Sequence, residues 1–154
     1  YSWCKPICQE LNTAMKSRRE PSKNDIEKIW YSDSNGDYCG GINHEHYNQT
    51  RYHALNLHSF FSKGTVEFRL FNSTLHAGKI KAYVQFCLAL SAWAIESEGR
   101  IVFRSVSGYT SAQKATLMYH ILTNRLGLYG DEFKTCRYHL TRRFKNYAMD
   151  IAAA

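Results

Sequence analysis

The chain has 154 residues, of which 44% are hydrophobic and 14% aromatic, so it can form one domain with a core of ordinary size. It contains no run of 18 or more apolar residues, which excludes a membrane-spanning helix. Its formal net charge of +7 favours an anionic partner, such as a nucleotide, a nucleic acid or an acidic protein surface, without selecting among them.

Two helices and a long loop are predicted in the first third of the chain. Residues 3–17 carry an apolar helical stripe, and Ser22 starts a second helix with Asp25 three residues later, as in a capping box. Residues 32–49 form a polar loop whose length is typical of functional or mobile segments. The motif Asn43-His-Glu-His-Tyr47, with His53 and His58, could bind zinc. A solvated loop is the favoured interpretation, since zinc needs three or four convergent ligands.

The next segment predicts a β-hairpin. Residues 54–58 and 65–71 read as strands, and the link over residues 59–64 ends in glycine. If Asn56 lies opposite Glu67, the alternation of side chains along a strand brings four polar residues to one face. These are Asn56, His58, Glu67 and Arg69. The other face is then apolar and forms the core side, with Leu55, Leu57, Val66, Phe68 and Leu70.

Three helices are predicted after the hairpin. Residues 78–95 form a strong helix with an expected buried stripe of Ile80, Val84, Cys87, Leu88, Ser91 and Ile95. Thr110 or Ser111 caps the next helix, which ends at Gly127. Asp131 and Glu132 start the last helix. The expected fold class is α+β, a small antiparallel sheet centred on the hairpin at about residues 54–71 and packed by about five α-helices.

The last predicted helix is basic and carries aromatic residues. It could contact nucleic acid or an acidic protein, although a solvated helix face explains the same pattern. The basic residues are Lys134, Arg137, Arg142, Arg143 and Lys145.

Five cysteines occur in the chain, an odd number with no repeating spacing. This usage favours a reducing, cytoplasmic setting over a disulfide framework. We expect a single domain over residues 1–150, followed by a disordered tail at residues 151–154.

Glu67 and Arg69 are the residues that suggest chemistry most directly. A carboxylate is a hard oxygen ligand for a metal ion, and a guanidinium is a forked donor for phosphate. Fixed side by side on a sheet, the two suit a metal–nucleotide. The alternative is an ion pair on the surface, which would add little to stability.

Several stretches resemble the amidoligase family, whose members look like ATP-dependent carboxylate–amine ligases with a glutamine-synthetase-like fold. They are residues 75–83, residues 126–134, Arg51-Tyr-His-Ala-Leu-Asn-Leu-His58 and Gly64-Thr-Val-Glu-Phe-Arg-Leu-Phe71. The resemblance implies ATP and Mg²⁺ as cofactors and small carboxylates and amines as substrates. It also implies that Glu67 faces the metal, that Arg69 contacts phosphate, and that Arg51 and Asn56 position substrate or phosphate.

Family members also carry an N-terminal strand with a Glu-x-Glu pair that is thought to hold the metal bound to ATP. No Glu-x-Glu occurs before Arg51 in this sequence. The chain is therefore expected to be an N-terminally shortened, partial ligase fold, with that segment either lost or lying outside these residues.

Loss of the strand would expose a sheet edge that a protein partner or a second copy could cover. The alternative function is then a non-catalytic binding protein. It could come from a phage or mobile element and inhibit a host defence nuclease, as an anti-CRISPR protein does, or it could bind nucleic acid.

Overall fold

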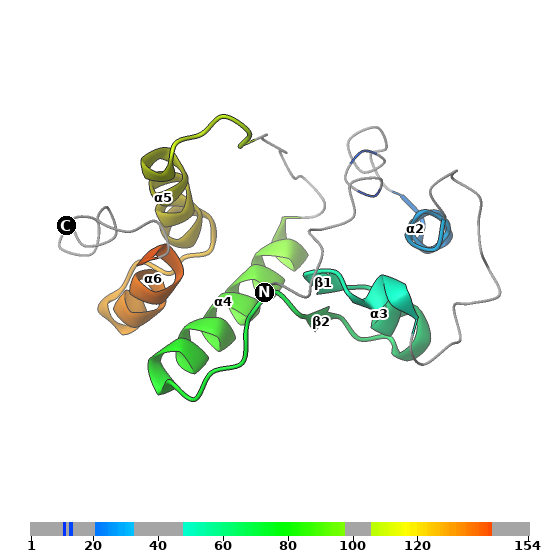
Figure 1. Cartoon of the computed structure of the whole chain (residues 1–154), viewed down its shortest axis with the longest axis horizontal. Helices are drawn as coiled ribbons and strands as arrows, with labels where there is room; N and C mark the ends of the chain where they lie inside the picture. Colours follow the sequence, from blue (N-terminus) through cyan, green and yellow to red (C-terminus); the bar gives the residue numbers. More distant parts are fainter. Residues whose placement is uncertain (1–10, 12, 14–20, 33–47, 98–105, 143–154) are drawn as a thin grey trace. The chain divides into compact units, whose positions relative to one another are not determined.

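The computed structural model describes residues 11, 13, 21–32, 48–97 and 106–142 (Figure 1). Contacts divide the chain into two units, residues 1–72 and 73–154. The helix expected over residues 3–17 lies outside the described residues except for Leu11 and Thr13, which are helical. The 43–47 motif, Arg143, Lys145 and residues 151–154 also lie outside them.

The first unit begins its described part with α2 (Lys23–Trp30). The capping box predicted at Ser22 is present, because the Asp25 N–H donates to Ser22 Oγ and the Ser22 N–H donates to Asp25 Oδ2, each at 3.2 Å. The core of this unit lies where α2 meets the segment after the first strand. It contains Leu11, Trp30 and Tyr31, with Ile26, Ile29, Leu57 and Phe61 packed against them.

The predicted strands form a two-stranded antiparallel sheet, β1 (Leu55–Asn56) and β2 (Glu67–Phe68). Asn56 pairs with Glu67, so the predicted register is confirmed. The strands are shorter than expected, because α3 (His58–Lys63) replaces the predicted turn and takes His58 out of the first strand. Gly64 ends this helix in the left-handed conformation, with φ of 73°, and so acts as a helix C-cap.

The prediction of which sheet face is buried was wrong at four positions. Val66 and Leu70, expected in the core, are 46% and 38% exposed, whereas the polar residues Asn56 and His58 are 1% and 6% exposed. Asn56 can be buried because its side chain is bonded to Glu67, Ser59 and the His58 N–H, which removes the cost of an unpaired buried amide.

The second unit is helical in its described part. It contains α4 (Ala77–Glu96), α5 (Ser111–His120), η3 (Ile121–Arg125), η4 (Asp131–Phe133) and α6 (Lys134–Thr141). The Gln113 N–H donates to the Thr110 side chain, which confirms a cap at Thr110. Gly127, with φ of 66°, follows the last turn as predicted. Helix α6 packs against both α4 and α5.

The predicted buried stripe of α4 was largely wrong. Four of its members are exposed, and the buried residues of α4 are Ala82 and Phe86. Ala82 is small enough for α6 to approach closely, and the Cys136 thiol donates to the Ala82 carbonyl oxygen at 3.4 Å. The exposed members are Ile80, Val84, Leu88 and Ile95.

The expected α+β class is confirmed for the described residues, which contain five α-helices and a two-stranded antiparallel sheet. No helix in the described part of the chain has the length and apolar character that a membrane span requires.

Candidate functional site

The side chain of Glu67 is held at both of its oxygens. Asn56 Nδ2 donates to Glu67 Oε2 at 2.6 Å, and Arg69 Nη1 donates to Glu67 Oε1 at 3.3 Å. Asn56 reaches Glu67 because the two residues are directly paired across β1 and β2. The Glu67 side chain is 45% exposed, so its carboxylate is oriented by protein donors and still accessible from solvent.

Buried groups fix the side chain of Asn56. Its Oδ1 accepts from the His58 N–H at 2.9 Å, at the first residue of α3. His58 Nδ1 lies 2.6 Å from the hydroxyl oxygen of Tyr31, the residue that caps the C-terminus of α2. Tyr31 and His58 are 1% and 6% exposed. His58 therefore links the end of α2 to the site, because its ring bonds to Tyr31 and its backbone N–H bonds to Asn56, which in turn donates to the carboxylate of Glu67.

Two guanidinium groups approach the ring of Tyr52. The Arg69 guanidinium carbon lies 5.1 Å from the ring centroid and that of Arg51 lies 5.9 Å from it. Such cation–π contacts restrain the orientation of both side chains. With one carboxylate and two guanidinium groups, this part of the surface has an excess of positive charge and suits an anion.

The segment that carries Arg51 is held by a second network. Trp30 Nε1 donates to Thr50 Oγ1 at 2.9 Å, and Thr50 Oγ1 donates to Asn48 Oδ1 at 2.7 Å. This arrangement forms η2 (Gln49–Arg51) with Asn48 as its cap. His53 Nδ1 lies 2.7 Å from the Thr50 carbonyl oxygen, so His53 is part of this network.

The structure thus brings together the four residues that the sequence singled out in this unit: Arg51, Asn56, Glu67 and Arg69. The Asn56 amide faces Glu67 and the α3 backbone. Sequence reasoning missed the contributions of Tyr31 and Tyr52. Tyr31 had no local signal, since its partner His58 lies 27 residues away.

Metal ligands are sparse near the site. In the described ranges no group of three or more His, Cys, Asp and Glu residues could hold a metal ion. His58, considered above for zinc, is paired with Tyr31. Among the residues that the structure describes, Glu67 is a single hard oxygen donor at the site, which fits Mg²⁺ in its usual mode, bound through one or two carboxylates plus phosphate oxygens and water.

The basic residues of the last helix have different roles. Arg137 Nη1 donates to the carbonyl oxygens of Leu128 and Gly130, at 2.7 and 2.9 Å, and so stabilises the turn before η4. Lys134 and Arg142 are exposed.

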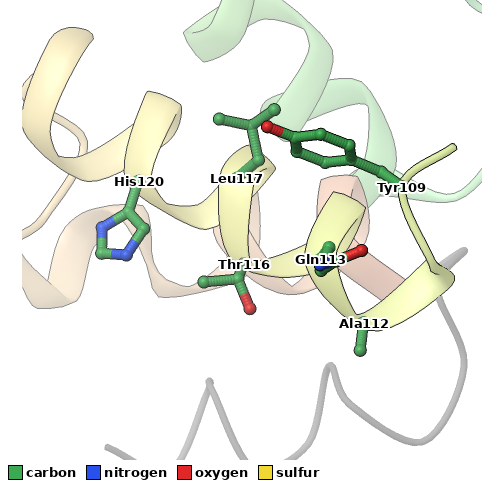
Figure 2. Close-up of a pocket in the computed structure, with 6 residues that line it drawn as sticks. All are labelled: Tyr109, Ala112, Gln113, Thr116, Leu117 and His120. Atoms are coloured by element: carbon green, nitrogen blue, oxygen red, sulfur yellow. The ribbon is translucent and has the colours of Figure 1, made fainter. Parts of the chain in front are cut away.

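A hollow of about 440 Å³ lies along one face of α5 (Figure 2). Its lining comes from the start and one side of that helix, and none of the site residues predicted from the sequence contributes to it. The lining residues are Tyr109, Ala112, Gln113, Thr116, Leu117 and His120.

Comparison with known proteins gives one match. A family model described as "Putative amidoligase enzyme" matches residues 1–91, a range that includes Arg51, Asn56, Glu67 and Arg69. No curated protein and no solved structure matches the chain.

Proposed function

Because the chain belongs to the family described as "Putative amidoligase enzyme", we propose that it takes part in ATP-dependent ligation of a carboxylate to an amine. The observation that supports this reaction most directly is the arrangement of Glu67 and Arg69. A carboxylate with both oxygens oriented lies next to a guanidinium restrained on Tyr52. These are the groups that a Mg²⁺-bound triphosphate requires from a protein.

The reaction has two steps. A carboxylate oxygen of the acid attacks the γ-phosphorus of ATP, the bond to the β–γ bridging oxygen breaks, and ADP leaves from an acyl phosphate. The amine nitrogen then attacks the acyl carbon, phosphate leaves, and the nitrogen loses a proton to solvent. Charge builds on the transferring phosphoryl oxygens in the first step, so donors placed beside them lower its barrier.

Each residue of the site has a distinct role in this proposal. Arg69 donates to the phosphoryl oxygens, and Arg51, which also contacts the Tyr52 ring, adds a second positive charge nearby. Glu67 provides one oxygen ligand to Mg²⁺, which would neutralise the triphosphate. Asn56 is a positioning residue, because its amide is already bonded to Glu67 and to the His58 N–H.

Trapping with hydroxylamine tests this proposal without knowledge of the natural amine. The chain is incubated with ATP, Mg²⁺, hydroxylamine and a panel of small carboxylic acids, and hydroxamate and ADP are quantified. We expect equal amounts of both with at least one acid, and their loss in Glu67→Gln. Glu132→Gln, at an exposed position in η4, is the matched control. ATP turnover that persists unchanged in Glu67→Gln would refute the assignment of the site.

Binding of nucleic acid or an acidic protein through α6 is a second candidate function. The exposed positions of Lys134 and Arg142 support it. Binding of this kind weakens steeply with salt, because each phosphate contact releases counterions. Lys134→Glu with Arg142→Glu should then reduce both the affinity for a DNA duplex and its salt dependence. An unchanged affinity in that variant would eliminate α6 as the contact surface.

A further inference from the structure

Helix α4 is apolar on two opposite faces. One face carries Ala82 and Phe86, which are 0% and 9% exposed, on the helix that packs against α6. The opposite face carries the α4 stripe, defined as Ile80, Val84, Leu88 and Ile95, which are 47%, 53%, 67% and 80% exposed. A helix that is apolar all round is normally buried on all sides. A row of exposed apolar side chains therefore indicates an interaction surface.

The stripe has the dimensions of a helix-packing surface. At about 100° per residue its four side chains fall within an arc of about 80°, and from Ile80 to Ile95 they extend along about 22 Å of the helix axis. Ser91 falls in the same arc, so a small side chain alternates with the large ones. Such alternation lets two helices interdigitate.

Charge indicates which partner fits. The charged residues of α4 are Lys79 in its first turn, Lys81 at the start of its second turn and Glu96 at its end. Lys81 and Glu96 lie on the same side of the stripe, at about 100° and 160° from Ile80. Two copies of α4 packed antiparallel would place Lys81 of each near Glu96 of the other. A parallel arrangement would instead bring like charges together.

We infer that the α4 stripe is the contact surface for a second copy of this chain, packed antiparallel about a twofold axis at Leu88. In this arrangement the two Leu88 side chains meet at the axis, and Val84 of one copy faces Ser91 and Ala92 of the other. Self-contact through one patch is the usual geometry of a twofold dimer. This surface is separate from the sheet edge considered above, and the inference does not depend on the proposed reaction.

Sedimentation equilibrium of the full chain, over a range from micromolar to several hundred micromolar, tests the inference. We expect a monomer–dimer equilibrium for the wild type. Leu88→Glu should weaken the dimer by roughly 100-fold or more, since it places two carboxylates at the centre of a desolvated contact. Leu88 is 67% exposed, so the substitution leaves the helix packing on α6 intact, which circular dichroism would verify.

A charge exchange tests the antiparallel arrangement itself. Lys81→Glu should weaken the dimer by roughly tenfold, and adding Glu96→Lys to it should restore the wild-type affinity. Lys114→Glu, an equal charge change at an exposed position on α5, should have no effect. A chain that stays monomeric throughout overturns the inference. A dimer that survives Leu88→Glu, or is not restored by the charge exchange, also overturns it.

Discussion

Replacing Asn56 by aspartate tests the hydrogen-bond series beneath the candidate site. The substitution preserves size and keeps an oxygen to accept the His58 N–H. It replaces the amide group that donates to Glu67 Oε2 at 2.6 Å with a second carboxylate oxygen. Two acceptor oxygens then face each other. One belongs to position 56, which is 1% exposed in the wild type, and the other belongs to Glu67, whose side chain is open to solvent.

The expected cost follows from this geometry. The lost hydrogen bond to a charged acceptor is worth about 1.5 to 3 kcal/mol. Repulsion between two charges at about 4 Å has an upper value of about 4 kcal/mol near a protein surface. It is smaller here because Glu67 is 45% exposed. The loss has an upper limit, because the new carboxyl can bind a proton instead of staying charged. Protonating a carboxyl with an ordinary pKa of about 4 at pH 7 costs about 4 kcal/mol, since each pKa unit corresponds to about 1.4 kcal/mol. We expect a loss of about 3 to 4 kcal/mol.

The pH dependence makes the prediction specific. Protonating a carboxyl with an ordinary pKa of about 4 costs only about 1.5 kcal/mol at pH 5. The protonated group can donate to Glu67, so the loss should shrink to about 2 kcal/mol there. Urea unfolding, followed through the indole N–H signal of Trp30, measures this directly at both pH values. Asn72→Asp, at an exposed position in the same unit, is the control. A loss below about 1 kcal/mol, or an equal loss at both pH values, would refute the reasoning.

Three further changes test other parts of the structure. Tyr31→Phe leaves the buried His58 nitrogen without its hydroxyl partner, which should lower the free energy of unfolding by about 1 to 3 kcal/mol in urea titrations; no change would contradict the pairing. Burial and the neighbouring His76 lower the pKa of His139. Its stabilising contribution is therefore complete above about pH 6.5 and is lost as the pH falls from there through the folded-state pKa. His139→Gln should reduce this acid sensitivity, and equal sensitivity in both proteins would argue against it. Burial raises the pKa of Cys136 to about 11. At pH 8 the native wild type and the native Cys136→Ser variant should therefore show the same number of thiols that react with Ellman's reagent, and they should differ by one thiol only in denaturant. A difference between the two native proteins would show that the Cys136 thiol is accessible and would contradict this prediction.

Local signals in the sequence predicted much of the secondary structure. The capping boxes at Ser22 and Thr110 arise from side chains three residues apart, and such contacts are encoded within one helical turn. The pairing of Asn56 with Glu67 was a supposition at the level of the sequence, made because it brings the polar side chains of both strands to one face, and the structure has this pairing. These features depend on residues that are close together in the sequence, or on two strands joined by a short connection.

Packing between elements was harder to predict. Periodicity cannot choose the buried face of α4, since apolar residues occupy opposite sides of it. The choice depends on the close approach of Cys136 to Ala82, 54 residues apart. Helix α3 was missed because six residues that end in glycine suit either a loop or a short helix. The burial of Asn56 depends on that helix, since the first N–H of α3 bonds to its side chain.

Calorimetric titration of the chain with ATP and Mg²⁺ at moderate salt tests the central proposal most directly. We expect saturable binding that weakens by at least about tenfold in Arg69→Ala, since a charge-assisted bond to phosphate is lost. Arg125→Ala, which removes a guanidinium from an exposed position in the other unit, should bind as the wild type does. Absence of binding, or equal binding by wild type and Arg69→Ala, would contradict the assignment of a nucleotide phosphate site to Arg69 and Glu67.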